Sequence, residues 1–137
     1  VVSALAPDRK ERLTPAAEWL RAKSELMCLS TMTILEVRQG IARLKRLGSG
    51  ERAIRLEHWL QSICEDAEER IVLFDTEIAL EAGNLSDAAI AKGAHPGIAD
   101  LVIAATAKVR NLDLLTRNVR HFEPLGIKCQ DPFDTVR

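Results

Sequence analysis

The stretch PGIADLVIAATAKVRNLDLLTRNVRHF, residues 96–122, reads as an apolar helix, a short strand and a polar cluster in succession. Pro96 and Gly97 are typical of a helix start, because proline loses no hydrogen bond at the first helical position. Apolar side chains then recur at three- and four-residue spacing, which predicts one buried helical face. The residues of this face are Ile98, Leu101, Val102, Ala105 and Val109.

The same stretch carries polar groups at the start of the predicted helix and at the end of the predicted strand. Asp100 lies in the first turn of the predicted helix, and Thr116, Arg117 and Asn118 follow the apolar run 112–115. If that run is a parallel strand, its carboxyl end lies at the same edge of the sheet as the helix start. A lone acid in a first turn is also explained by the helix dipole, and a polar cluster by turn chemistry. A third group at this edge is therefore needed to indicate a site.

Length and composition limit the class of protein. The chain has 137 residues, which predicts a single domain spanning 1–137. Its 19 Lys and Arg against 20 Asp and Glu give a net charge of −1, so a nucleic acid would have to be bound by local basic patches. We expect no membrane span and no signal peptide, and therefore a cytoplasmic protein.

The cysteines favour a reducing environment. Cys28, Cys64 and Cys129 are odd in number, far apart and without C-x-x-C spacing. This pattern predicts free thiols rather than a disulfide framework or a zinc site.

Short apolar runs alternate with helical patterns along the chain. The predicted strands are 26–29, 71–74, 112–115 and 127–129, and the predicted helices include 15–24, 34–47, 51–64 and 75–89. The alternation predicts an α/β fold with a parallel sheet and helices on both faces. Such a sheet needs a long apolar central strand, and none of these runs is one. Because the chain opens with Val1 rather than Met, we expect that strand to lie upstream of residue 1.

Glu36 supplies the third group. It lies in the opening turns of the helix that follows strand 26–29, at the same predicted edge as Asp100 and Asn118. Two carboxylates and an amide are hard-oxygen ligands, which suit Mg²⁺ or Mn²⁺ rather than zinc. The natural chemistry is phosphodiester hydrolysis assisted by one or two ions. Glu36 also follows Thr33 at capping-box spacing, so a purely structural role remains open at this point.

Three motifs resemble the PIN-domain family, and more narrowly the VapC/FitB-type ribonuclease toxins of bacterial type II toxin–antitoxin systems. They are STMTILEV (30–37), GIADLVIAATA (97–107) and LLTRNVRHF (114–122), and the likeness extends to the closing Asp-Pro-Phe. The resemblance implies a three-layer α/β/α fold with a central parallel sheet and an acidic pocket for Mg²⁺ or Mn²⁺. It also implies endoribonuclease activity, a VapB-like antitoxin, a homodimer within a larger toxin–antitoxin assembly, and DNA contact only through the antitoxin.

The resemblance also assigns roles to single residues. Glu36 matches the family's acid on the helix after the second strand, and Asp100 matches the acid that opens the later helix. Asn118 falls where many members have Asp, so the implied metal ligands are Glu36, Asp100 and Asn118. Thr116 matches a hydroxyl that lines the same pocket, which completes the implied catalytic set.

One departure from the family concerns its first strand, which ends in Leu-Asp-Thr-Asn and supplies a principal metal-binding Asp. Residues 1–5 resemble what directly follows that motif, so we expect the first strand and first acid to be absent from this chain. We therefore expect an incomplete metal site, and a chain that is weakly stable or inactive unless the missing segment is present or another chain supplies a strand by swapping. The alternative reading is a catalytically incomplete PIN-fold binding module that acts through protein partners.

Cationic side chains near the predicted pocket are candidates for binding substrate phosphates. They are Arg38, Arg43, Arg117, Arg120 and His121. His121 also titrates near neutrality, which suits a general acid or base, or it stacks on a base. Charges on helix faces are more often simply solvated surface.

Overall fold

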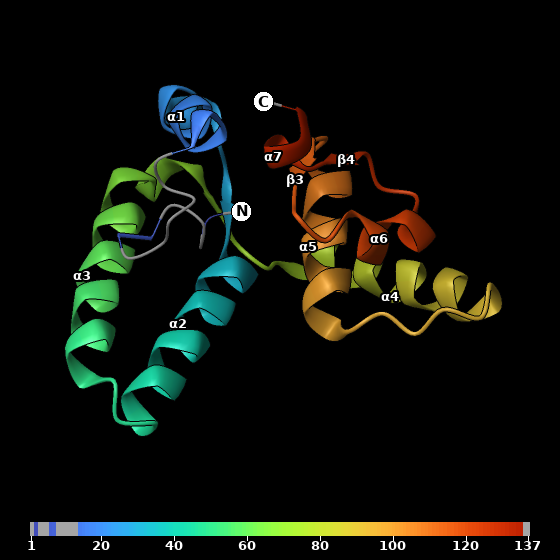
Figure 1. Cartoon of the computed structure of the whole chain (residues 1–137). Helices are drawn as coiled ribbons and strands as arrows, with labels where there is room; N and C mark the ends of the chain where they lie inside the picture. Colours follow the sequence, from blue (N-terminus) through green and yellow to red (C-terminus); the bar gives the residue numbers. More distant parts are fainter. Residues whose placement is uncertain (1, 3–5, 8–13, 136–137) are drawn as a thin grey trace.

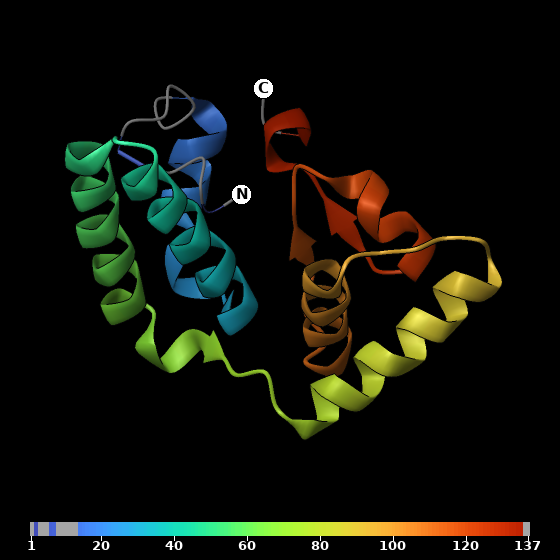
Figure 2. The same cartoon turned by 90° about the horizontal axis from the view of Figure 1, so that it is seen from below.

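The computed structural model describes residues 2, 6–7 and 14–135, whose elements form two groups (Figure 1). The first group contains α1 (Pro15–Ala22), β1 (Leu29–Ser30), α2 (Thr31–Arg46), α3 (Gly50–Asp66) and β2 (Ile71–Val72). The second contains α4 (Thr76–Ala91), α5 (Ile98–Val109), β3 (Leu114–Leu115), α6 (Val119–Phe122), β4 (Cys129–Gln130) and α7 (Pro132–Thr135). Short 3₁₀ turns lie inside each group: η3 (Ser24–Leu26) between α1 and β1, η4 (Glu68–Arg70) between α3 and β2, and η5 (Glu123–Leu125) between α6 and β4. Figure 2 shows the groups diverging from the segment between β2 and α4.

Hydroxyl side chains fix where two helices begin. The Thr14 hydroxyl accepts a hydrogen bond from the Ala17 N–H at 3.3 Å, and Pro15 occupies the first helical position, as predicted. The Ser30 hydroxyl accepts from the N–H groups of Met32 and Thr33, at 3.1 and 3.3 Å. Helix α2 therefore begins at Thr31, earlier than its sequence pattern predicted.

Residues with positive φ end three of the long helices. Gly48, Gly93 and Asn111 have φ values of 89°, 78° and 52° directly after the caps of α2, α4 and α5. In each case the next N–H donates to a carbonyl one turn back, as Ser49 does to Leu44 at 3.0 Å. This is the Schellman arrangement, which glycine favours because it has no Cβ to clash. The predicted end of α2 at its Leu-Gly sequence is confirmed.

The described strands pair in parallel, as the alternation of elements predicted. Leu29 pairs with Ile71 in β1 and β2, and Leu114 pairs with Cys129 in β3 and β4. Within the described residues the strands make two separate pairs, so β1 and β3 each keep an unpaired edge. That a central strand lies outside this chain stays a prediction.

Three predicted strands were too long, and the structure gives the reason for each. Leu26 is 78% exposed inside η3, so the run 26–29 is wrong as a buried strand and only its last residue joins β1. Phe74 is half exposed and its N–H donates to the Thr31 hydroxyl, which ends β2 early. The Leu112 N–H donates to the Ala107 carbonyl at the end of α5, so β3 starts only at Leu114.

Two hydrophobic cores correspond to the two groups. The larger lies between α4 and α5, where the four-residue and three-residue spacing of α4 buries one face. Its α4 members are Ile78, Ala82, Leu85 and Ala89, and they meet Leu101, Val102, Ala104 and Ala105 of α5 together with Phe122 and Leu125. The smaller core joins α2 to α3 through Ile41, Ala53, Leu56 and Leu60. The predicted helical hairpin is thus confirmed.

Helix α5 is the most apolar helix, but it has only twelve residues. Its predicted face is buried at Leu101, Val102 and Ala105, whereas Ile98 is 70% exposed because the first turn extends past the core. No helix in the described part of the chain combines the length and the apolar character needed to cross a bilayer. The three cysteines are free, as their spacing predicted.

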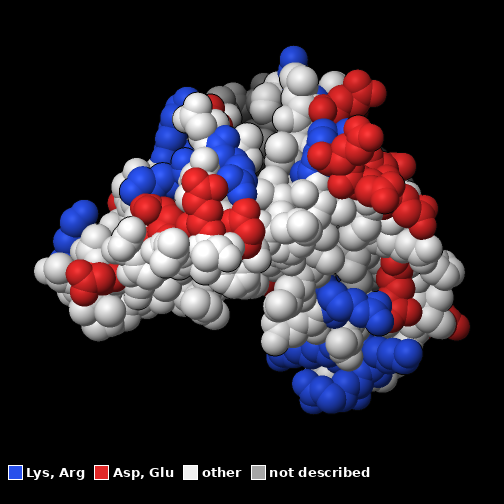
Figure 3. Space-filling model, turned by 180° about the vertical axis from the view of Figure 1, so that it is seen from behind, with Lys and Arg blue, Asp and Glu red and all other residues white. Residues whose placement is uncertain are grey.

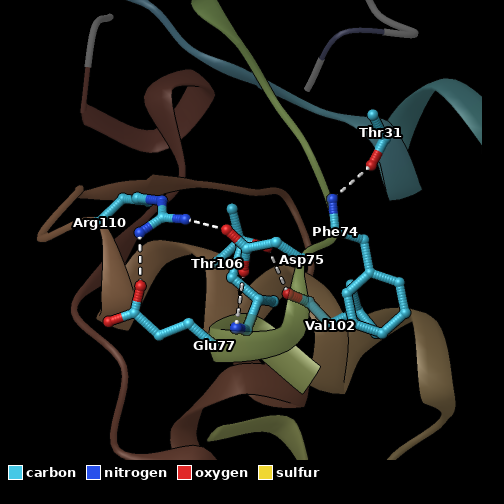
Figure 4. Close-up of polar contacts among 8 residues, drawn as sticks. Thr31, Phe74, Asp75, Glu77, Val102, Thr106 and Arg110 are labelled. Atoms are coloured by element: carbon cyan, nitrogen blue, oxygen red, sulfur yellow. Dashed lines mark hydrogen bonds and ion pairs between the residues drawn. The ribbon is translucent and has the colours of Figure 1, made fainter. Parts of the chain in front are cut away.

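Polar contacts hold the segment that links the two groups (Figure 4). The Phe74 N–H donates to the Thr31 hydroxyl at 3.1 Å, which ties the linker to the start of α2. Arg110, after α5, forms ion pairs with Asp75 and Glu77 at the start of α4. These bonds fix the first turn of α2 and the first turn of α4 relative to α5.

Candidate active site

Glu36 lies in the second turn of α2 with its side chain exposed. Because Ser30 caps the helix and Thr33 is already its third residue, Glu36 is not the acid of a capping box. The pKa of Glu36 is raised above its ordinary value by partial desolvation of the carboxyl group and by the negative charge of Asp100. The negative charge of Asp100 therefore acts on Glu36, and that the two residues share a metal site stays a prediction.

Asp100 lies in the first turn of α5, on the opposite group of elements. Its Oδ2 is 3.0 Å from Nδ1 of His121, at the end of α6. The helix cap is Gly97, which has no side chain, so the carboxylate of Asp100 is the anion at this helix start. Asp100 thus interacts with both Glu36 and His121.

Thr116 and Asn118 position His121 through backbone contacts. The Thr116 N–H donates to the Gln130 carbonyl at 3.0 Å and so extends the pairing of β3 with β4. The Thr116 hydroxyl accepts from the Asn118 N–H at 3.1 Å, and the Asn118 carbonyl accepts from the His121 N–H at 2.9 Å. The predicted residues Thr116, Asn118 and His121 therefore form one bonded turn beside Asp100.

A cavity of about 260 Å³ opens on this turn. It is lined by Arg117, Asn118, Val119, Arg120, His121, Asp131 and Asp134. The predicted cations Arg117, Arg120 and His121 are thus brought together. The guanidinium of Arg117 also lies over the Phe133 ring, 5.1 Å from its centroid.

Two acids of this cavity were missed by sequence reasoning. Asp131 directly follows β4, as Thr116 follows β3, and Asp134 lies one turn further on. Because β3 and β4 are parallel, their carboxyl ends meet at one edge. The sequence signal that could have found Asp131 is its position directly after the last strand. The strand was predicted at residues 127–129, but β4 ends one residue later, at Gln130.

Arg38 lies outside this arrangement. Its Nη1 forms an ion pair with Oε1 of Glu57 on α3, at 2.7 Å. The contact joins the two helices of the hairpin and leaves the substrate role of Arg38 a prediction.

The donor set can be tested for its fit to a metal ion. Among the described residues, no group of three or more His, Cys, Asp or Glu side chains is arranged to hold one. Two carboxylates that repel each other, with the Asn118 amide on a neighbouring element, are nevertheless the oxygen donors that Mg²⁺ prefers. A divalent cation would relieve the repulsion that raises the pKa of Glu36. The residues fit as a partial ligand set, and their role as ligands stays a prediction.

Known proteins with similar sequences cover nearly the whole chain. The sequence profile of the family described as PIN domain matches residues 1–126. Toxin FitB of Neisseria gonorrhoeae is 31% identical over 130 residues, which are 94% of this chain and 90% of that protein. The tRNA(fMet)-specific endonuclease VapC of Salmonella typhimurium is 28% identical over 106 residues, which are 77% of this chain and 74% of that protein.

Solved structures share the fold. The crystal structure of FitAcB from Neisseria gonorrhoeae superposes with a TM-score of 0.77 at 31% identity, covering 94% of this chain and 90% of that chain. The structure of FitAB bound to an IR36 DNA fragment superposes with a TM-score of 0.79 at 28% identity, with the same coverage. The expected α/β fold of PIN type is confirmed.

Proposed function

The chain belongs to the PIN-domain family, and from this we propose that it is the nuclease toxin of a type II toxin–antitoxin pair that cuts RNA with Mg²⁺ or Mn²⁺. The observation that carries the proposal is the packing of α2 against α5, with Glu36 on the first helix placed where the charge of Asp100 on the second acts on it. Desolvation and the charge of Asp100 raise the pKa of Glu36, so keeping Glu36 ionised at this place destabilises the fold. Such an arrangement is typical of sites that bind a cation.

The surrounding residues have distinct tasks in this proposal. Arg120 and Arg117, which line the cavity beside Asn118, bind the phosphates that flank the scissile bond. Asp100 orients the His121 ring through their 3.0 Å contact, so that His121 holds or transfers a proton near the cut. Thr116 is a positioning residue, because its hydroxyl fixes the turn that carries Asn118 and His121.

Glu36, Asp100 and the Asn118 amide would hold the metal ion, which would stabilise negative charge on the phosphate under attack. The choice of RNA is supported by the VapC relative, which is a tRNA(fMet)-specific endonuclease. The FitAB structure contains DNA together with both partners of that pair. We propose that this chain likewise contacts DNA only through a VapB-like antitoxin, and that it works in the cytoplasm as a homodimer.

The test is cleavage of single-stranded RNA with Mg²⁺ or Mn²⁺, with EDTA as the metal-free control. We expect Asp100→Asn and Glu36→Gln each to lower the rate by roughly 10²–10³-fold, because each removes a charge that acts on the reacting phosphate. Asp87→Asn is the matched control, since Asp87 is an exposed acid of α4 to which this proposal gives no role. Equal rates for Asp100→Asn and Asp87→Asn would contradict the proposal.

One observation favours a second candidate, a PIN-fold binding module without catalysis. The described residues hold no cluster of three metal-binding acids, histidines or cysteines. A protein that binds its antitoxin tightly, yet cuts RNA with neither metal, would be this module. Calorimetry with Mn²⁺ separates the two candidates further, because the module would show no metal binding that Asp100→Asn abolishes.

A further inference from the structure

The α2–α3 hairpin carries its charges in two separate blocks. Residues 43–55 contain five Arg or Lys and one Glu, whereas residues 57–69 contain five Asp or Glu and no Arg or Lys. Figure 3 shows the hairpin at the right, with blue atoms gathered at its lower end and red atoms at its upper end. We call the lower end the hairpin tip, and its basic residues are Arg43, Lys45, Arg46, Arg52 and Arg55.

Helix stability accounts for the α2 part of this separation, because Arg43, Lys45 and Arg46 lie in the last turn of α2, where the dipole favours cations, but it does not account for the α3 part. Arg52 and Arg55 lie in the first turns of α3, where the helix dipole disfavours cations. Glu65 and Asp66 lie in its last turn, which contains no basic residue, although the dipole disfavours anions there. Apart from Glu51 in the first turn, the charge order of α3 is therefore opposite to the order that would stabilise the helix.

Within the described residues, most basic side chains of the hairpin tip form no ion pair that would stabilise the fold. Arg43, Lys45, Arg46 and Arg55 are exposed, and none of them forms an ion pair with another described residue. By contrast, Arg38 in the middle of α2 is paired with Glu57. The charges of these four residues are thus available to an external anion.

A stripe along α2 joins the tip to the candidate active site. Three residues follow Glu36 on the same helical face, at spacings of three, seven and ten residues: Gln39, Arg43 and Arg46. All four side chains are exposed. Glu36 is the single acid of α2 and stands at the end nearest Asp100. From Glu36 to Arg46 the stripe runs about 15 Å along the helix axis.

Between Glu36 and Arg43 no side chain projects from the stripe at Gly40, because glycine has none. It lies in the interior of α2 and is exposed, and a Cβ added to it would meet nothing within 4 Å. The packing of this chain therefore does not require glycine here, although glycine weakens a helix interior. Glycine at such a place permits close approach of another molecule's backbone.

We propose that this stripe and the hairpin tip bind the backbone of a single-stranded RNA that extends from the active site, with phosphates on Arg43 and Arg46. The proposal rests on the proposed function, which places the cut at Glu36 and Asp100. It adds to that function by naming the residues that bind the part of the RNA remote from the cut. The class of ligand is an RNA strand several nucleotides longer than the site itself.

The first test measures binding of a labelled RNA of about 20 nucleotides by fluorescence anisotropy, in EDTA so that no cutting occurs. We expect Arg43→Gln with Arg46→Gln to weaken binding about tenfold and to reduce the slope of log affinity against log salt by about 1.4, for two lost phosphate contacts. Lys23→Gln with Lys92→Gln removes the same charge from two other exposed positions and should leave the slope unchanged.

The second test uses glycine, so that misfolding cannot imitate the result. Gly40→Ala should raise the melting temperature and yet weaken RNA binding, because the new methyl group stabilises the helix and obstructs the stripe. Gly83→Ala is the matched control, since Gly83 is also exposed inside a helix, α4, with open space around its added Cβ. It should raise the melting temperature and leave RNA binding unchanged.

The outcomes separate this proposal from the proposed function. If wild-type protein fails to cut RNA in Mg²⁺ or Mn²⁺ but the variants lower binding as expected, the nuclease proposal fails and the RNA surface stands. If wild type cuts while the Arg43 and Arg46 variant binds with unchanged affinity and slope, the stripe is overturned. It is also overturned if that variant instead abolishes self-association seen by sedimentation, because the tip then meets the acidic end of a second copy.

Discussion

The α2–α3 hairpin and the α4–α5 pair are both built from two packed helices, but they bury very different shares of their residues. Helix α5 buries six of its twelve residues, half of them alanine, against α4 and the turn after β3. Helix α2 has sixteen residues and buries one of them, Ile41. A helix buried on most sides has little surface left for a ligand, whereas α2 keeps a polar stripe from end to end.

The candidate active site combines the two regions. Asp100, Thr116, Asn118 and His121 belong to the well-packed region, and Glu36 belongs to the hairpin. The distance between Glu36 and Asp100 therefore depends on how firmly the start of α2 is held against α5. Met32, which packs against the larger core, and the bond from Phe74 to Thr31 supply that connection.

The largest expected effect comes from the core of the α4–α5 pair. Ile78 is fully buried there, and Ile78→Ala should lower the free energy of unfolding by about 3–4 kcal/mol, because it leaves a cavity among rigid neighbours. Ile41→Ala in the hairpin should cost about 2–3 kcal/mol, because the smaller core can collapse more easily. Urea unfolding of both variants measures the difference. Equal costs would show that the two cores are equally rigid.

A smaller effect is expected where the two regions meet. Thr31→Val removes the acceptor of the Phe74 N–H, which is exposed enough to bond to water instead, so stability should fall by about 0.5–1 kcal/mol. RNA cleavage should fall more steeply than stability, because Glu36 loses its fixed place relative to Asp100. Thr31→Ser keeps the hydroxyl and is the control. Loss of stability without loss of cleavage would contradict this positioning role.

The smallest effect is a pH-dependent gain in stability. Because the folded-state pKa of Glu36 is raised above its ordinary value of 4.5, the folded state binds this proton more tightly than the unfolded state does. Stability is then lost as the pH rises from below 4.5 through the raised pKa. At about pH 7, Glu36→Gln should therefore be more stable than wild type, by less than about 1 kcal/mol for such an exposed group.

The difference between Glu36→Gln and wild type should vanish in acid, where the carboxyl is protonated in both the folded and the unfolded chain. Thermal melts across this pH range measure it, with Glu51→Gln at an exposed position of α3 as the control. A stability difference that stays constant with pH would mean that neither desolvation nor Asp100 raises the pKa of Glu36.

Helix positions and their ends were largely predictable from local sequence. Thr14-Pro15, the Leu-Gly pair at the end of α2 and the periodic apolar residues of α4 act within one or two turns, so their effect needs no distant partner. Strand bounds were not predictable, because a strand ends where its partner or a competing bond ends it. Leu112 and Phe74 are apolar, yet their N–H groups are taken by Ala107 and Thr31.

The candidate site divides in the same way. Glu36, Asp100, Thr116 and Asn118 were predictable from motifs because helix starts and strand ends of a parallel α/β fold face one edge. The pairing of His121 with Asp100 and the entry of Asp131 and Asp134 into the cavity depended on β4 and α7, whose positions follow from long-range packing. The pairing of Arg38 with Glu57 depended likewise on the hairpin.

The sequence by itself determined the helices and their caps, because each of these depends on neighbours along the chain. Only the tertiary structure decided that Glu36 is not a capping residue, that its carboxyl group is close to Asp100, and that the basic residues on both sides of Gly48 form one hairpin tip. Electrostatic interactions act through space, so their strength is set by the distances that folding creates.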